Sequence, residues 1–193
     1  MIETQLTLDD IIQMTLRDGE NWALAHARRL LKLIKQIGAD IPCDSYTITV
    51  ATYMHDWGAF PCYAKKDVEH AIRSRQVVEA DILPHMVLES SVKEIILEAI
   101  ELHDYRDMRP TQSNEALLLR EADMLEFLGM IGMARDFARG PRDVMKCYKR
   151  ILSRRNDIQG RFTIPRSREI AQVRFERMEQ CLNWLKEESF GVL

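Results

Sequence analysis

The chain has 193 residues, 46% of them hydrophobic, which is enough for one domain with a buried core that needs no disulfide bond for stability. Its 27 basic and 30 acidic side chains leave a net charge of only −3, which argues against the broad positive surface of a nucleic-acid-binding protein. The four cysteines lie far apart without a C-x-x-C pair, so the sequence predicts neither a disulfide framework nor a zinc clip.

Targeting and membrane signals are also missing from the sequence. Residues 1–5 show no basic region followed by an apolar run. No stretch approaches the ~18 uncharged apolar residues that a membrane span needs. We therefore expect a soluble, cytoplasmic protein with neither a membrane nor a nucleic acid as its partner.

The segments between the few glycines and prolines have a helical period. The first predicted helix covers residues 21–37, with Trp22 and Leu30 on its apolar face. His26 lies in the same row, so we expect its side chain to point into the core. Residues 46–57 are ambiguous, because a β-branched run near their start is compatible with a strand, but the helical surroundings favour a helix.

Two later segments place polar side chains on apolar faces. Residues 91–103 are a predicted helix that ends with His103 on its apolar side. Residues 114–137 are one long predicted helix, with Asp123 in its apolar stripe. A buried, ionised carboxylate is costly unless it is paired or binds a metal, so Asp123 requires a partner.

Further helices are predicted over residues 67–82 and 141–188, the second of them broken near residues 160–165. With seven or eight helices in all, the predicted fold class is all-α, a single-domain helical bundle. Six arginines in the last third of the chain are expected on solvated faces: Arg150, Arg154, Arg155, Arg161, Arg166 and Arg168.

The sequence offers Asp123 two kinds of partner. Arg120 or Arg135 would form an ion pair with it. A metal ion is the alternative, because four of the five histidines lie on four separate helical segments in the first two thirds of the chain: His26, His55, His70 and His103. Asp56 directly follows His55. The residues by themselves leave three interpretations open, namely an ion pair, hydrogen-bonded core histidines and a dispersed metal site.

The order of these residues is typical of one protein family. His26, then His55-Asp56, then Asp123 resembles the H…HD…D signature of the HD-domain superfamily of metal-dependent phosphohydrolases, and in particular its small stand-alone bacterial members. His70 and His103 look like the two additional histidines of members that bind two metal ions. Around Asp123 the sequence is also similar to the alanine-aspartate segment of the family, and the C-terminal helix looks like theirs.

The resemblance covers nearly the whole chain and carries its own implications for the fold. It implies a single HD domain over residues 1–193, with the metal-site core at about residues 20–140 and a C-terminal helical extension at about residues 141–193. A homodimer is compatible with this resemblance.

The resemblance implies a metal-dependent phosphohydrolase that acts on a phosphate ester or anhydride, with a nucleotide as the expected substrate. The implied metal ligands of the first ion are His26, His55, Asp56 and Asp123. His70 and His103 are expected to hold a second ion, with Asp56 as the bridge, or else to orient the phosphate and protonate the leaving group. Asp56, His70 and His103 are therefore the expected catalytic residues. Such ligands suit Mn²⁺, Fe²⁺, Mg²⁺, Ni²⁺ or Zn²⁺, with one or two ions per site.

One departure from the family concerns phosphate binding. The residues after Asp56 lack the lysine that many relatives carry shortly after the HD pair. Lys66 and Arg28 are expected to contact the phosphate in its place. Two alternative functions stay open for the same fold: a di-iron oxygenase, and a non-catalytic module that senses a nucleotide.

Overall fold

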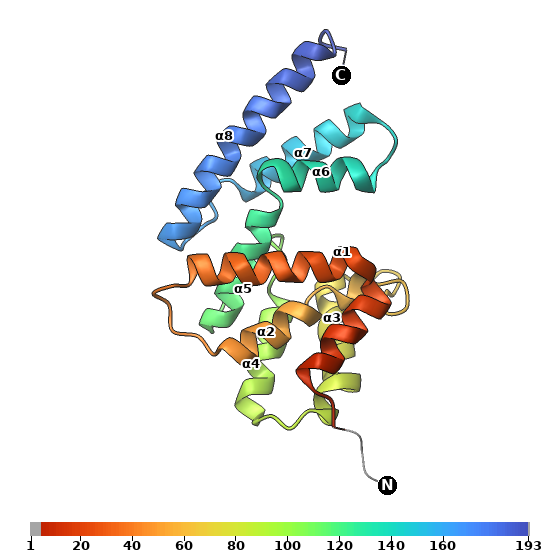
Figure 1. Cartoon of the computed structure of the whole chain (residues 1–193), viewed down its shortest axis with the longest axis vertical. Helices are drawn as coiled ribbons and strands as arrows, with labels where there is room; N and C mark the ends of the chain where they lie inside the picture. Colours follow the sequence, from red (N-terminus) through yellow and green to blue (C-terminus); the bar gives the residue numbers. More distant parts are fainter. Residues whose placement is uncertain (1–4, 193) are drawn as a thin grey trace. The chain divides into compact units, whose positions relative to one another are not determined.

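The computed structural model describes residues 5–192, which form eight α-helices and no β-strand. This confirms the predicted all-α fold class (Figure 1). The chain divides into two compact units, Met1–Arg120 and Glu121–Leu193, and the domain limits expected from the sequence stay a prediction. No helix in the described range is long and apolar enough to cross a membrane. Most of the expectation about residues 1–5 falls outside the described residues.

Four complete helices belong to the first unit, and a fifth begins in it: α1 (Leu8–Ile37), α2 (Ser45–Met54), α3 (His70–Val77), α4 (Ser90–Glu101) and α5 (Asn114–Glu126). α2 packs against both α1 and α4, and α3 also packs against α4 (Figure 1). After α3 the chain continues through a π-helical turn, Val78–Ile82, and a 3-10 helix, Leu83–His85. The histidines predicted to face the core are all carried by this unit.

Helix α2 resolves the ambiguous segment in favour of a helix. Seven of its ten residues are buried, among them Ile48 and Val50 of the β-branched run. Asp44 starts the helix by accepting a hydrogen bond from the backbone N–H of Thr47 at 2.7 Å. A helix that is buried on nearly all sides gains more from packing than its β-branched residues lose in helix propensity, so tertiary burial decides its conformation.

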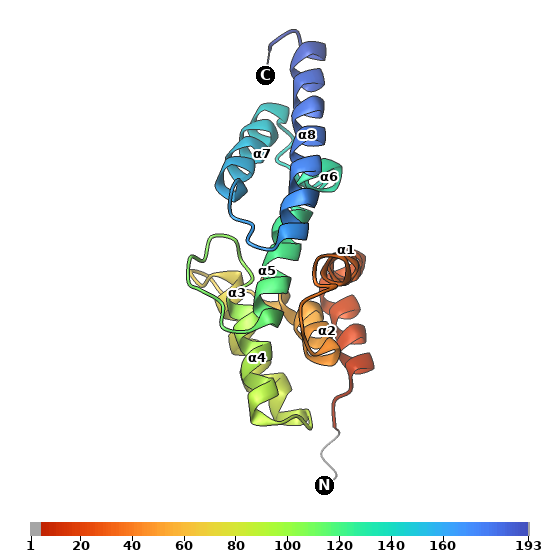
Figure 2. The same cartoon turned by 90° about the vertical axis from the view of Figure 1, so that its left-hand side faces the viewer.

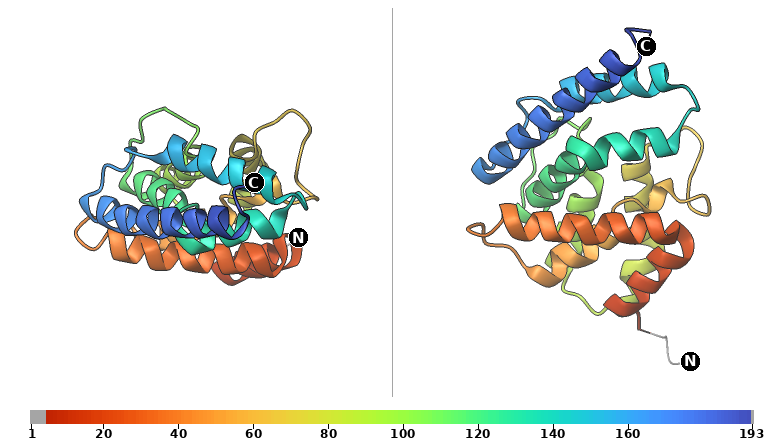
Figure 3. Two further views of the ribbon diagram at one scale, coloured as in Figure 1. Left: turned by 90° about the horizontal axis from the view of Figure 1, so that it is seen from above. Right: turned by 45° about the horizontal axis from the view of Figure 1, so that its top comes forward.

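Helix α1 starts earlier than the sequence predicts and bends in the middle. Its first turn is stabilised by a capping box between Thr7 and Asp10. Glu20 has non-helical angles, with φ 57° and ψ −171°, and divides α1 into two straight parts (Figure 3). The predicted apolar position of Trp22 is wrong, because that side chain is 47% exposed. It lies two residues after the bend, and its ring meets the Phe60 ring in a T-shaped arrangement with the centroids 5.8 Å apart.

The prediction of one long helix over residues 114–137 is also wrong, because two helices occupy this segment. α5 ends at Glu126 and α6 (Gly129–Arg139) begins three residues later. Gly129 has φ +71°, a conformation that side chains disfavour, and it allows the chain to turn between the helices. Apolar periodicity continued across this break, so the sequence pattern did not reveal it.

The second unit contains α6, α7 (Val144–Ile158) and α8 (Pro165–Glu188). α6 packs against both of the other helices (Figure 2). Their apolar faces meet in one cluster, formed by Met133, Ile151, Met178 and Leu182. Glu121 is buried and accepts hydrogen bonds from the backbone N–H groups of Thr163 and Ile164, which stabilises the start of α8.

Two of the arginines expected on solvated faces are engaged with a buried carboxylate instead. Arg150 Nε lies 2.8 Å from Asp136 Oδ1, and Arg154 Nη1 lies 2.7 Å from Asp136 Oδ2. The Arg154 guanidinium also lies over the Phe127 ring, 4.4 Å from its centroid. The expectation is therefore wrong for Arg150 and Arg154, because Asp136 is buried and needs compensating charge.

We expect Asp136→Ala to lower the free energy of unfolding by about 3 kcal/mol, because it leaves two guanidinium groups without their carboxylate. Urea denaturation followed by circular dichroism measures this loss. Glu169→Ala is the matched control, since Glu169 pairs with Arg166 on the surface and its removal should cost less than about 1 kcal/mol. Equal losses for the two variants would contradict the structural importance of the Asp136 cluster.

The 3-10 helix Trp57–Ala59 connects α2 to the loop before α3 and packs closely against α3. The backbone N–H of Gly58 donates to Ser74 Oγ at 2.7 Å. A Cβ atom on Gly58 would lie only 2.2 Å from the carbonyl oxygen of His70 and 2.6 Å from the backbone nitrogen of Ser74. Only glycine therefore allows this close approach, which brings the start of α3 beside the end of α2.

Gly58→Ala should lower the free energy of unfolding by about 1–3 kcal/mol, because the added methyl group meets backbone atoms that have no room to move aside. The adjacent variant Ala59→Ser also adds one heavy atom, but at an exposed position, and should have almost no effect. Parallel urea titrations compare the two. A Gly58→Ala protein as stable as Ala59→Ser would show that α3 does not depend on this contact.

Candidate metal centre

Four histidines of the first unit come from four different helices or their ends. His26 lies within α1, His55 directly follows α2, His70 begins α3, and His103 follows α4 by two residues. His26, His55 and His103 are buried, whereas the His70 side chain is 26% exposed. The expectation that His26 and His103 point into the core is confirmed.

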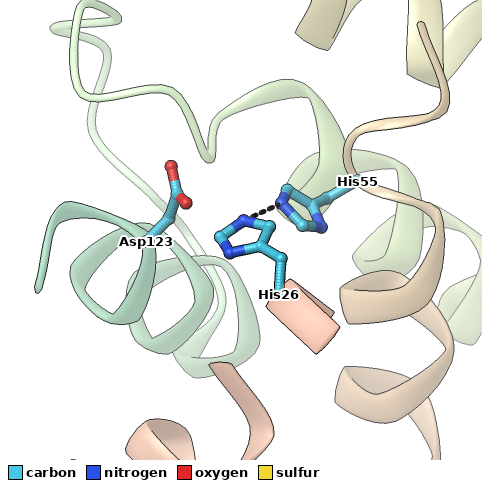
Figure 4. A group of neighbouring side chains, drawn as sticks. All are labelled: His26, His55 and Asp123. Atoms are coloured by element: carbon cyan, nitrogen blue, oxygen red, sulfur yellow. Dashed lines mark hydrogen bonds between the residues drawn. The ribbon is translucent and has the colours of Figure 1, made fainter. Parts of the chain in front are cut away.

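The four imidazoles form two close pairs. The Nε2 atoms of His26 and His55 are 3.3 Å apart, and the dashed line in Figure 4 marks this contact. The Nε2 atoms of His70 and His103 are 3.1 Å apart. The rings of His55 and His103 also meet edge to face, with centroids 4.7 Å apart, so the two pairs are neighbours.

Backbone carbonyl groups determine the tautomer of two of these rings. His55 Nδ1 lies 2.7 Å from the carbonyl oxygen of Thr52, and His103 Nδ1 lies 2.6 Å from that of Ile100. A carbonyl oxygen only accepts, so each Nδ1 carries the hydrogen. In the neutral ring the Nε2 atom then presents its lone pair, which is the arrangement found in metal-bound histidines.

Asp56 lies between the two histidine pairs. Its Oδ2 atom is 3.7 Å from His26 Nε2 and 3.4 Å from His55 Nε2. Its Oδ1 atom is 3.4 Å from His70 Nε2 and 3.7 Å from His103 Nε2. Each oxygen of one carboxylate therefore faces one pair of imidazoles.

The surroundings of Asp56 keep its carboxylate charged. Burial by itself would raise the pKa of this group, but the interactions with His55, His103, His26 and His70 lower the pKa well below its ordinary value. The carboxylate is thus ionised at neutral pH and faces four nitrogen atoms.

Asp104 is a member of the cluster that the sequence analysis missed. It is buried, and its Oδ2 atom lies 3.6 Å from His70 Nε2 and 2.6 Å from Arg106 Nη2. Burial would raise the pKa of Asp104, but the hydrogen bonds from Arg106 lower it to about 2. The sequence contains a pattern that could have identified Asp104, because His103-Asp104 is a second His-Asp pair.

The donor set fits a divalent metal ion. Two neutral imidazoles that face each other through Nε2 lone pairs repel unless a proton or a cation lies between them. His55, Asp56 and His103 each offer one ligand atom, and these atoms all lie within 4.8 Å of one another, as do those of Glu69, His70 and Asp104. Imidazole and carboxylate together suit the first-row divalent ions.

Three further residues were predicted from the sequence: Asp123, Lys66 and Arg28. Asp123 is buried on the part of α5 that belongs to the second unit, and Figure 4 shows that it comes from a different helix than His26 and His55. Lys66 is exposed in the loop before α3. Arg28 is exposed on α1, two residues after His26, and on a helix this spacing directs the two side chains to nearly opposite sides.

Arg120 and Arg135, which the sequence offered as ion-pair partners of Asp123, have defined contacts in the fold. Arg120 donates to the carbonyl oxygens of Leu102 and Arg109, at 2.5 Å and 2.9 Å. Arg135 lies 3.6 Å from the buried carboxylate of Glu126. Arg120 therefore supports the loop that carries His103 and Asp104.

Comparison with solved structures shows the same fold in several bacterial proteins. Bacillus subtilis YpgQ matches with a TM-score of 0.69 and 20% identity over 94% of each chain. Its complex with ADP matches with a TM-score of 0.68, 20% identity, and coverage of 94% of this chain and 97% of that one. A predicted HD superfamily hydrolase from an uncultured Thermotogales bacterium has a TM-score of 0.64 and 21% identity, covering 94% of this chain and 90% of its own.

Sequence comparison gives a more direct assignment. No curated protein sequence matches the chain. A profile of the HD domain matches residues 23–128, which include the four histidines of the cluster together with Asp56 and Asp123. Because this match spans more than half of the 193 residues, the chain belongs to the HD domain family.

Proposed function

We propose that the protein is a metal-dependent phosphohydrolase that cleaves a phosphate ester or anhydride. One observation carries the proposal: four imidazole Nε2 atoms converge on the two oxygens of a single ionised carboxylate, Asp56. A structural role alone does not require such a set, because buried histidines are satisfied by one or two hydrogen bonds each. A set of this kind is suited to holding cations near a reacting group.

The proposed ligands fall into two groups that share Asp56. His26, His55, Asp56 and Asp123 hold the first ion, in agreement with the order of the HD family signature. His70 and His103 hold a second ion next to Asp56 Oδ1. The arrangement of one carboxylate oxygen for each histidine pair supports a bridging role of Asp56.

A bound divalent ion supplies a nucleophilic water at neutral pH and neutralises charge on phosphoryl oxygens. The chain itself orients the ligands, because the carbonyl groups of Thr52 and Ile100 hold His55 and His103 by their Nδ1 hydrogens. His70 is the most exposed of the four imidazoles and therefore lies on the side from which a substrate approaches. If one ion binds, His70 is placed to donate a proton to the leaving group.

A nucleotide is the proposed substrate class. The structure of Bacillus subtilis YpgQ in complex with ADP supports this choice, although that ligand is a property of YpgQ. Lys66 stays a proposed phosphate contact from the exposed loop before α3. Arg28 stays a proposed contact with less support, since it leaves α1 away from His26.

The proposal is tested by assaying phosphate release from a panel of nucleotides and small phosphoesters, with protein purified without chelator and then supplied with Mn²⁺, Mg²⁺, Fe²⁺, Ni²⁺ or Zn²⁺ in turn. Metal-dependent release of phosphate from at least one substrate is expected, and EDTA should abolish it. Oxygen consumption with Fe²⁺ but no phosphate release would favour the oxygenase alternative. Nucleotide binding without turnover would favour the sensor.

Asp56→Ala should remove metal-dependent stabilisation. A ligand at 100 times its Kd stabilises the native state by about 2.7 kcal/mol, which raises the Tm of a chain of this size by about 5–10 °C. We expect Mn²⁺ to raise the Tm of the wild type and of His85→Ala, whose histidine lies outside the cluster, but not of Asp56→Ala. A variant that melts much lower with and without Mn²⁺, beside a wild type insensitive to the ion, would show that Asp56 is structural.

His70→Ala and His103→Ala separate a two-ion site from a one-ion site. If His70 and His103 together bind a second ion, both variants should retain about half of the wild-type metal. Their activity should fall by more than about 100-fold. Elemental analysis after gel filtration measures the metal content. Full metal content with lost activity would assign these histidines to substrate contacts, and wild-type activity in both variants would exclude them from the site.

A further inference from the structure

We propose that Arg106 is the side chain that binds the phosphate group of the substrate. We further propose that Asp104 holds the Arg106 guanidinium at the edge of the histidine cluster, in position for the phosphate. This inference rests on the proposed function and names the phosphate contact that the family pattern leaves open. The proposed ligand is a phosphate monoester or the terminal phosphate of a nucleotide.

A single oxygen atom connects Arg106 to the cluster. Asp104 Oδ2 contacts Arg106 Nη2 at 2.6 Å and His70 Nε2 at 3.6 Å. The guanidinium is thus separated from a proposed metal ligand by one carboxylate oxygen. A phosphate oxygen that takes a place beside His70 therefore arrives next to Arg106.

The Arg106 side chain is held in a defined direction yet remains accessible. Its Nε donates to Asp104 Oδ1 at 2.9 Å, and its Nη2 reaches Glu69 Oε2 at 3.1 Å. Among the described residues, no acceptor uses its Nη1, and the side chain is 53% exposed. The guanidinium is pre-oriented with a free donor, which lowers the entropy cost of binding a phosphate.

The loop that carries Arg106 is itself braced. Arg120 donates to the carbonyl oxygens of Leu102 and Arg109, which precede and follow Arg106 in this loop. Glu98 accepts hydrogen bonds from the backbone N–H groups of Gln112 and Ser113 at its end. Arg106 therefore extends from a fixed support.

Charge balance makes the proposed binding depend on the metal. The carboxylates of Asp104 and Glu69 contact Arg106, and that of Asp56 lies 3.4 Å from His70, so this part of the protein without metal disfavours an incoming phosphate. Divalent ions bound at the histidines would reverse this balance.

The test is isothermal titration with inorganic phosphate as the probe, on wild type, Arg106→Gln and Arg106→Lys, each with and without Mn²⁺. With Mn²⁺, Arg106→Gln should weaken phosphate binding by about 10- to 100-fold, because a charge-assisted hydrogen bond is lost. Arg106→Lys should keep part of the affinity, since it retains the charge without the planar fork. Without Mn²⁺, none of the three proteins should bind phosphate measurably.

Arg109→Gln is the matched control. Arg109 lies on the same loop with a similar exposure, but it pairs with Asp107 and Glu101 instead of Asp104. Its substitution should leave phosphate affinity unchanged, and elemental analysis should show the same Mn²⁺ content in Arg106→Gln and wild type. In turnover, Arg106→Gln should raise KM more than it lowers kcat.

Wild-type phosphate affinity in Arg106→Gln, or an equal loss in Arg109→Gln, would overturn the assignment of Arg106. So would a wild type that binds no phosphate with Mn²⁺ present. These outcomes are distinct from failure of the proposed function, because Arg106-dependent phosphate binding without hydrolysis of any substrate would reject the hydrolase and keep the phosphate site.

Discussion

The negative charge of Asp56 is the constraint on which the rest of the site depends. An ionised carboxylate in a largely buried position needs compensating groups, and the chain supplies four imidazoles, with one pair facing each oxygen. The histidines in turn need a negative group, because any cation held among them must be balanced. The cluster therefore combines groups whose electrostatic requirements neither the aspartate nor the histidines satisfy alone.

Apolar packing brings these groups to one place. α2 is buried on nearly all sides between α1 and α4 and is followed directly by His55-Asp56, so a tightly packed helix delivers the central carboxylate. Gly58 then lets α3 approach closely enough for His70 to reach Asp56. The precision of the site is thus a consequence of well-packed helices, which keep side chains in single rotamers more reliably than loops do.

The exposed side of the cluster has a different organisation, based on charged pairs instead of apolar contacts. Asp104 lies between His70 and Arg106, and Glu69 contacts the same guanidinium from the solvent side. Such pairs rearrange at a lower cost than a packed core, because water replaces the contacts that are lost. A rigid buried half with an adaptable edge would suit the proposed hydrolase, which has to hold its ligands fixed while a charged substrate enters and leaves.

The sequence by itself determined the helical class, the inward direction of His26 and His103, and the ordered residues of the HD family, because helical periodicity and motif order are local properties. It did not reveal the part of α1 that precedes the bend at Glu20, because the predicted helix begins only at residue 21, or the break before Gly129, because apolar spacing continues through it. Only the tertiary structure showed that Asp104 joins the cluster and that Arg150 and Arg154 compensate Asp136. Those pairings depend on which helices pack together, and distances between residues far apart in the chain are not encoded in any local pattern.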